Sequence, residues 1–379
     1  MVVVYAASTP TGAGVYITKH LADGALDATH GIGGVAVQEL VRSPANFFYG
    51  GASRQVDGKI IVVGCVLRQT TPFASGLQSD VFIARLEPDG RLDRTFGLGG
   101  MVPPSSTLGY ACLRDVAIQG DGRIVVGGSA GDDLIFARLS SSGAFDPSFG
   151  VGGVARLSAN VVMANSSPGD RVALSRLGIS LDGFIVGGGA RNRSGGAPGF
   201  LVNFIVRVNA ANGQLDGGFG PVTFVAYEPS GGVMNLAVSD DATIVANGRW
   251  RVSGSADSCV AKLSSAGATN AIFGASGLKC GVYGPSPVTD PGQIAIQADG
   301  KIIVTGVVFP DGIVPRSRTM VTRLLGNGTF DQTFGNAGVV DLGTLPQPVP
   351  QSMLIQPAGK IVVLTNALGP PYSLVRLNP

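Results

Sequence analysis

The sequence predicts an all-β fold of short antiparallel strands, and three observations support this class. Glycine accounts for 58 of 379 residues, about 15% and roughly twice its usual share. Hydrophobic residues make up 45% of the chain and charged residues only 14%, which is far too apolar for a disordered chain. A turn resembling Asp-Gly-x-Leu-Asp and ending in Phe-Gly, once in His-Gly, recurs along the chain, with short apolar strands between its copies.

The recurring turn shows that the chain is a tandem repeat. Its final glycines are Gly31, Gly97, Gly150, Gly220, Gly274 and Gly335, separated by 66, 53, 70, 54 and 61 residues. Unequal steps indicate loops of variable length on a constant frame. Residues that repeat are expected to serve the architecture, so a specific function must depend on what differs between copies.

The third copy, the most compact, defines a unit of four strands. We predict strands over Asp115–Gln119, Arg123–Gly128, Leu134–Leu139 and Val154–Leu157. The second strand is continuously apolar in most copies, as expected of a strand covered on both faces. Four-stranded antiparallel units that cannot bury both faces alone stack radially as the blades of a β-propeller.

Seven copies fill one predicted propeller domain over residues 1–379, and the first and last copies are partial. Strand two is expected to start near Val2, Ile60, Ile124, Phe184, Thr243, Ile302 and Ile361. Because only six first strands exist, we favour six blades, with Val35–Leu40 as the outer strand of the last blade and the hairpin Val2–Leu21 left over. Seven blades are the alternative, since ring closure between the termini solves the problem of exposed edges.

The repeated motifs resemble the bacterial delta-60 repeat. They are Gln-x-Asp-Gly-Lys-Ile-x-Val-x-Gly at Gln297–Gly306, Ala-Arg-Leu at Ala84–Leu86, and Leu-Asp-x-x-Phe-Gly at Leu92–Gly97 and Leu215–Gly220. The fifth copy departs most, with Lys262 for the arginine and Asn270 for the aspartate. The resemblance implies a β-propeller, often on exported or surface proteins of bacteria, without an established shared activity.

Most repeated polar residues have a structural interpretation. The Asp-Gly pairs, such as Asp57-Gly58, fit the tight turn of a hairpin better than a metal site. The strand-three arginines are expected to pair with the aspartate of the next turn, and the phenylalanine of Phe-Gly is expected to fill the gap between blades. His30, in place of that phenylalanine, is interpreted as a tolerated substitution.

Charge and cysteine content exclude several classes of protein. A net charge of +2 without clustered Lys and Arg argues against nucleic acid, and no apolar run is long enough to cross a membrane. The first residues lack the features of a signal peptide. Cys259 and Cys280 lie on predicted neighbouring strands, where they either form a bridge or remain two ordinary buried thiols. A secreted or cell-surface protein of a bacterium is expected from the resemblance; oligomeric state is left open.

The predicted binding residues lie in one type of loop, between strands two and three. They are Arg68, Arg191, Arg193, Arg249, Trp250, Arg251, Arg316 and Arg318. Arginine binds carboxylate or phosphate through two N–H groups and tryptophan stacks on a sugar or a base. We expect a non-catalytic module that recognises an anionic glycan, a phosphorylated ligand or an acidic protein, or alternatively solvated loop charge.

Two other roles are kept as alternatives. A carbohydrate-active hydrolase or lyase would use aspartates at the channel mouth, with Asp132, Asp133, Asp240 and Asp241 as candidates, although adjacent aspartates are more typical of turns. A purely structural role within a larger surface protein also fits. No cofactor is predicted; calcium on these residues or on Asp311 is considered, but the sequence has no Asp-x-Asp-x-Asp motif.

Overall fold

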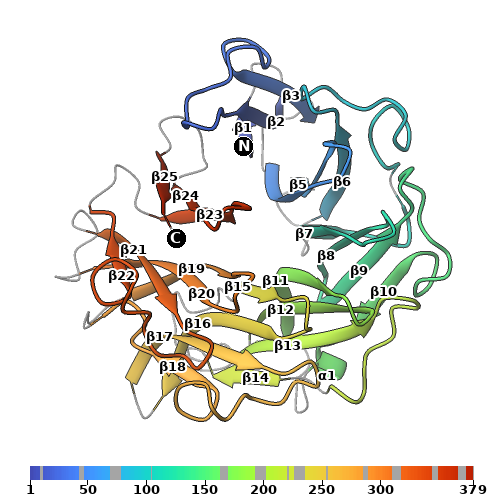
Figure 1. Cartoon of the computed structure of the whole chain (residues 1–379). Helices are drawn as coiled ribbons and strands as arrows, with labels where there is room; N and C mark the ends of the chain where they lie inside the picture. The colour runs from blue at the N-terminus through green and yellow to red at the C-terminus, as the bar shows by residue number, and fades with distance from the viewer. Residues whose placement is uncertain are drawn as a thin grey trace. The chain divides into compact units, whose positions relative to one another are not determined.

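A computed structural model describes the chain over residues 1–8, 12–41, 47–68, 78–103, 105–162, 170–192, 202–219, 222–225, 235–252, 255–284, 289–309, 317–343, 349–365 and 373–378. The chain divides into two compact units. The first unit contains 1–159, 172–179 and 209–214, and the second contains 160–171, 180–208 and 215–379. Figure 1 shows the strands in order of colour along the chain.

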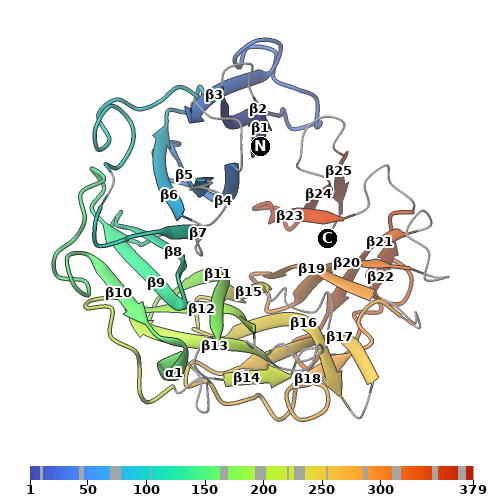
Figure 2. The ribbon, with the colours of Figure 1, turned by 180° about the vertical axis from the view of Figure 1, so that it is seen from behind.

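Three antiparallel sheets, here named blades one to three, belong to the first unit. Blade one contains β1 (Val2–Ser8), β2 (Ala13–Lys19) and β3 (Val35–Val41). Blade two, labelled in full in Figure 2, contains β4 (Phe47–Arg54), β5 (Ile60–Arg68) and β6 (Gln78–Leu86). Blade three contains β7 (Ala111–Ile118), β8 (Ile124–Ala130), β9 (Asp133–Leu139) and β10 (Val154–Leu157).

The division between the units runs through blade four, because most of its first strand belongs to the first unit. This blade contains β11 (Arg171–Ser180), β12 (Phe184–Asn192), β13 (Val202–Asn209) and β14 (Val222–Val225), and a four-residue helix, α1 (Ala159–Val162), precedes it. Blade five contains β15 (Asn235–Val238), β16 (Ile244–Val252), β17 (Ser255–Leu263) and β18 (Leu278–Cys280).

Two further sheets complete the second unit. Blade six contains β19 (Thr289–Ile296), β20 (Ile302–Val308), β21 (Arg318–Leu324) and β22 (Val339–Asp341). Blade seven contains β23 (Pro350–Ile355), β24 (Ile361–Thr365) and β25 (Ser373–Leu377). No helix in the described part of the chain is long and apolar enough to cross a membrane.

The described residues form seven sheets, so the preference for six blades is wrong and the seven-blade alternative holds. The predicted transfer of Val35–Leu40 to the last blade is also wrong, because β3 pairs with β2, for example Val37 with Tyr16. The hairpin near Val2 is therefore a blade of its own and not a surplus element. The predicted starts of strand two are confirmed, with β16 beginning one residue later, at Ile244.

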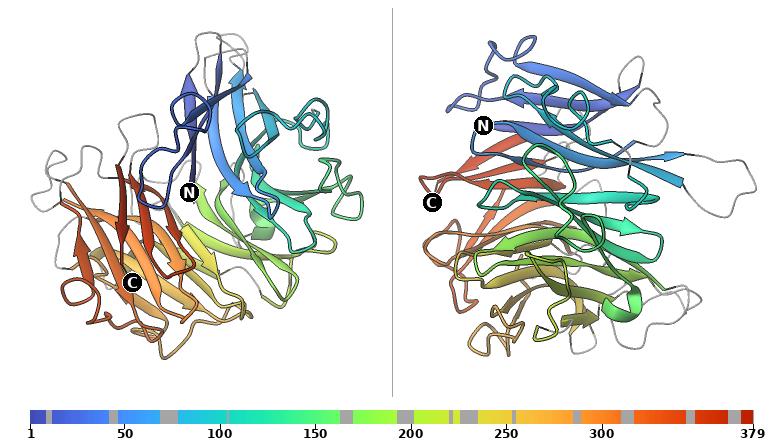
Figure 3. Two further views of the ribbon diagram at one scale, coloured as in Figure 1. Left: turned by 45° about the horizontal axis from the view of Figure 1, so that its top comes forward. Right: turned by 90° about the vertical axis from the view of Figure 1, so that its right-hand side faces the viewer.

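Strand two of a blade that has a neighbouring blade on each side is covered on both faces, as its continuous apolar sequence predicted. In β16, Ile244 packs into a cluster with Ile205 of blade four, whereas the next residue, Val245, packs with Val304 of blade six. Side chains that alternate along a strand thus serve two different cores. In the first unit, successive sheets lie face over face in the same way (Figure 3, right), with Ile61 and Ile124 in one cluster.

The strand-three arginines form the predicted ion pairs. The Nε–Oδ2 distances are 2.6 Å for Arg85–Asp93, 3.0 Å for Arg138–Asp146, 2.8 Å for Arg207–Asp216 and 2.8 Å for Arg323–Asp331. The pair in blade three also reaches the next blade, because an Nη atom of Arg138 donates to Ser148 Oγ at 2.8 Å and to the carbonyl of Ala211 at 2.9 Å. The Ser148 hydroxyl and then the Arg138 charge outweigh burial and hold the pKa of Asp146 below its ordinary value.

The phenylalanine of four Phe-Gly pairs lies beneath the next blade's turn. Phe149 is fully buried, with the Arg138 guanidinium 4.9 Å from its ring centroid, and a Cβ on Gly213 would lie 3.1 Å from its ring. Gly213 also has φ +74°, so glycine is required there for both space and conformation. The same contact joins Phe96 to Gly143, Phe219 to Gly267 and Phe273 to Gly328. We call the arginine, the aspartate, the phenylalanine and the next turn the interblade lock.

Blade five lacks the ion pair of the interblade lock. Lys262 still donates to a carbonyl of the next blade, that of Gly326, at 2.9 Å. Asn270 accepts only the N–H of Ile272, at 3.2 Å, and being neutral it cannot neutralise the lysine. In blade one, by contrast, Lys19 keeps a carboxylate partner, Asp27, at 2.9 Å.

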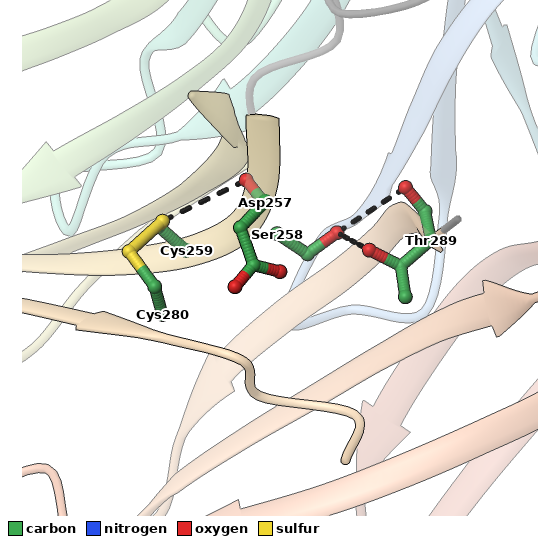
Figure 4. Close-up of a disulfide and its surroundings, with 5 residues drawn as sticks. All are labelled: Asp257, Ser258, Cys259, Cys280 and Thr289. Carbon is green, nitrogen blue, oxygen red and sulfur yellow. Dashed lines mark hydrogen bonds between the residues drawn. A yellow bond between two sulfur atoms is a disulfide. The ribbon is translucent and has the colours of Figure 1, made fainter. Parts of the chain in front are cut away.

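All four cysteines form disulfides. Cys65 of β5 is bonded to Cys112 of β7, so this bridge joins blades two and three across 47 residues of sequence. Cys259 and Cys280 are register partners on β17 and β18, and Figure 4 shows their bridge beside Ser258, whose hydroxyl lies 2.7 Å from that of Thr289. Between the two alternatives that the sequence left open, the structure has the bridge.

Replacing Cys65 and Cys112 together by serine is expected to lower the free energy of unfolding by about 2–4 kcal/mol, because the bridge closes a long loop in the unfolded chain. Denaturant titration of the oxidised wild type and the double variant measures the difference. Equal unfolding midpoints for the two proteins would contradict a stabilising bridge.

Candidate functional site

The predicted arginine site lies at the end of strand two, and those of its residues that the structure describes belong to strands and not to a loop. Arg191 belongs to β12, and Arg249 and Arg251 belong to β16, because both strands extend further than the sequence suggested. Arg68 ends β5 and Arg318 begins β21. Arg193 and Arg316 lie outside the described residues, as do most of the variable connections.

Trp250 is buried, so the expectation that it offers a stacking face to a ligand is wrong. Its side chain is 2% exposed, stacks on Phe224 with ring centroids 4.3 Å apart, and donates from Nε1 to Asn203 Oδ1 at 2.8 Å. The reason is the two-residue period of a strand, which points Trp250 to the opposite face of β16 from Arg249. That face packs on blade four.

Each predicted binding arginine whose side chain the structure describes has a carboxylate neighbour. Arg191 is buried and lies 3.6 Å from Asp170, and Arg249 lies 3.9 Å from Asp290. Arg318 contacts Asp341 through Nε–Oδ1 at 3.1 Å and Nη2–Oδ2 at 2.6 Å. The two short contacts hold the Arg318 guanidinium in position, whereas the carboxylates beside Arg191 and Arg249 lie beyond hydrogen-bond distance.

Strand register brings two of these arginines to the same end of blade six. Asp290 of β19, which faces Arg249, pairs with Val307 of β20, and the next residue, Val308, pairs with Arg318 of β21. Neighbouring strands are about 4.8 Å apart, so the backbones of β19 and β21 lie about 10 Å apart here. Arg318 is 46% exposed and Arg249 is 15% exposed.

Three of the four aspartates proposed for catalysis occupy turns, and Asp133 begins β9. Asp132 and Asp133 lie where strand two of blade three turns into strand three, and Asp133 lies 3.8 Å from Arg156. Asp240 and Asp241 lie in the turn before β16, where Asp241 accepts the N–H of Thr243 at 3.1 Å. Asp311 lies outside the described residues. Among the described residues, no group of three His, Cys, Asp or Glu is placed to hold a metal ion.

Two carboxyl groups that sequence reasoning missed have raised pKa values. Burial raises the pKa of Asp115, and the nearby Arg176 charge opposes the shift. The Asp115 carboxylate accepts the N–H of Val116 and, from the next blade's first strand, that of Leu177, both at 2.9 Å. Burial also raises the pKa of Asp290, against the charge of Arg249. Burial depends on tertiary packing, so no local sequence signal marks either residue.

A pocket of about 260 Å³ opens between blades five and six, where the interblade lock lacks its ion pair. Ser239, Asp241, Thr243, Val245 and Lys262 line it from blade five, and Ile296, Gln297, Ala298, Gly300 and Ile302 line it from blade six. The sequence contained a signal for this pocket, because the fifth copy differs from the others at Asp241-Ala242, Lys262 and Asn270. Ala242 adopts φ +61° at the position where other copies have glycine.

Comparisons with known proteins support the fold. Residues 55–96, 119–149 and 297–334 match the family described as "Domain of unknown function (DUF5122) beta-propeller". No curated protein sequence matches the chain. The seven antiparallel sheets and this match place the chain among all-β proteins of the β-propeller class.

Two solved structures are similar over the whole chain at low sequence identity. One is a polysaccharide lyase PL25, an ulvan lyase bound to -[GlcA(1-4)Rha3S]-, with 9% identity, a TM-score of 0.54, and coverage of 100% of this chain and 89% of the lyase. The other is Drosophila Semaphorin 2a, with 9% identity, a TM-score of 0.51, and coverage of 99% and 73%. At such identity the likeness supports the fold alone.

Proposed function

We propose that this chain is a non-catalytic recognition propeller that binds an anionic glycan at the strand ends of blades five and six. The observation that supports the proposal is the placement of Arg249 and Arg318 at one end of blade six, each beside a carboxylate. A guanidinium has five N–H donors, so one that pairs with an aspartate still has donors for a second carboxylate or sulfate. Phosphorylated ligands and acidic protein segments offer the same chemistry.

The test is binding of polygalacturonate, with dextran as the neutral control. We expect retention of the wild-type protein on polygalacturonate that weakens as salt is added, because exposed charges are screened within about 10 Å at 0.1 M ionic strength. Replacing Arg249 and Arg318 together by serine is expected to weaken binding about tenfold or more. Affinity chromatography and calorimetry both measure this change.

Arg91→Ser is the matched control, because this arginine is 86% exposed and lies in the first unit. It removes one cation from the surface without touching the proposed site, so binding should stay as in the wild type. Equal binding by the wild type, the double variant and the control, insensitive to salt, would overturn the proposal. Thermal melts of each variant establish that loss of binding does not reflect unfolding.

The second candidate function is a carbohydrate-active lyase or hydrolase. Its support is the raised pKa of Asp115, since a carboxyl group that stays protonated at higher pH is suited to general acid catalysis. The similar ulvan lyase acts on a polysaccharide, which agrees with this alternative. Release of reducing ends or unsaturated products from polygalacturonate would favour it over recognition alone, and loss of that activity in Asp115→Asn would assign the carboxyl group.

An oxidising compartment is part of the same proposal. Disulfides persist in secreted and surface-exposed proteins and are rare in the reducing cytosol, and here all four cysteines are bridged. We therefore propose that the chain works outside the cytoplasm of a bacterium.

A further inference from the structure

Blade five differs electrostatically from the blades with the complete interblade lock. In those blades, an aspartate lies within 3.0 Å of the strand-three arginine, and in blade five the corresponding residue is the neutral Asn270. Lys262 is half-buried and forms no ion pair with any residue in the described part of the chain. Lys262 lines the pocket, and its ammonium group donates a hydrogen bond to the backbone carbonyl of Gly326.

The pocket also offers hydrogen-bond acceptors. Asp241 accepts from Ser239 Oγ and the Thr243 N–H, and these two donors, followed by the Lys262 charge, hold its pKa below the ordinary value. Gln297 is 9% exposed and its Oε1 atom is buried without a hydrogen-bond partner among the described residues. A buried acceptor without a donor costs free energy, which a ligand's O–H would recover once the Gln297 amide turns toward the pocket.

A buried glutamine Oε1 atom without a hydrogen-bond partner is not a feature of this pocket alone. Gln55 and Gln119, at the same motif position, also have buried Oε1 atoms without partners. In the gap beside Gln119, however, the guanidinium of Arg85 spans from blade two to the carbonyl of Ser141 in blade three. The space beside Gln297 accompanies the replacement of this arginine by Lys262 and of its aspartate by the neutral Asn270.

These groups define the ligand by chemistry. Lys262 is suited to a carboxylate, while Gln297 Oε1 and Asp241 require O–H donors from the same molecule. Val245, Ile296 and Ile302 supply an apolar wall for the C–H face of a small ring. We infer that the pocket between blades five and six binds a hexuronate, a sugar with one carboxylate and several hydroxyl groups, as the free sugar or as a chain end.

This site is separate from the arginines of the proposed function. The pocket includes Thr243, just before β16, whereas Arg249 lies six residues further on, toward the other end of that strand. Six residues of strand span about 20 Å. Variants of one site therefore leave the other intact, and the two proposals fail or succeed independently.

The experiment is calorimetric titration with D-glucuronate, and with D-glucose as the matched neutral sugar. We expect a dissociation constant of about 1 mM for D-glucuronate, typical of a ligand of this size, and about tenfold or weaker binding of D-glucose. Lys262→Met is expected to weaken glucuronate binding about tenfold or more. A trisaccharide ending in glucuronate tells the free sugar from a chain end as the ligand, because it binds only if a chain end enters the pocket. Binding of either ligand supports the inference.

A second variant restores the repeat consensus. Lys262→Arg with Asn270→Asp is expected to rebuild the ion pair of the interblade lock, occupy the cation of the pocket and weaken glucuronate binding about tenfold or more, while the protein still melts cooperatively. The Arg249→Ser, Arg318→Ser protein is expected to bind glucuronate as the wild type does. No binding by the wild type at about 10 mM, or unchanged binding by both Lys262 variants, overturns the inference.

Discussion

Replacing Arg138 by methionine should lower the free energy of unfolding by about 3–5 kcal/mol. The side chain is 2% exposed, and the change removes its ion pair with Asp146, its bonds to Ser148 Oγ and the Ala211 carbonyl, and its contact with the Phe149 ring. It also leaves the Asp146 carboxylate without its main cation. Urea titration of the variant and the wild type measures the difference.

Arg91→Met is the control for the loss of an arginine. Its side chain is 86% exposed and lies 3.6 Å from Asp89, an exposed pair that contributes little to stability. We expect a change below about 0.5 kcal/mol in this variant. If Arg138→Met destabilised the protein no more than Arg91→Met, the interblade lock would not be a stabilising structure.

Phe149→Ala should cost about 3–5 kcal/mol, because the ring is fully buried and its removal leaves a cavity between blades three and four. The glycine turn above the ring is unable to fill the space, since Gly213 has no side chain. The measurement is again the free energy of unfolding in denaturant.

Val151→Ala provides the control in the same turn. Val151 is 79% exposed, so its truncation should change stability by less than about 0.5 kcal/mol. A loss below about 1 kcal/mol for Phe149→Ala would refute the role of the ring as the filling between blades.

Much of the fold was predictable because each repeated residue has one local task. The structure confirms the predicted apolar strands, the tight turns at Asp-Gly and the ion pair between Arg138 and Asp146. Each of these features depends on residues that are close in sequence. The number of blades was not predictable in this way. It depends on the pairing of β3 with β2, and the sequence pattern of an outer strand does not specify its partner.

The candidate sites were harder to predict, because they depend on where a side chain points. Trp250 lies between two arginines in sequence, yet strand alternation turns it into the core of blade four. The pocket of blade five accompanies a lost ion pair, because Lys262 and Asn270 replace the arginine and the aspartate of the other copies. The loss of an ion-pair partner produces no sequence motif. It can be recognised only when the fifth copy is compared with the other copies of the repeat.

The central claim is that the departure of blade five from the repeat creates a ligand site. A crystal of the wild-type protein soaked in D-glucuronate tests it most directly. We predict electron density for the sugar between blades five and six, with its carboxylate against Lys262 Nζ and a hydroxyl group against Gln297 Oε1. An empty pocket in such a crystal, or sugar density only beside Arg249 and Arg318, would contradict this claim.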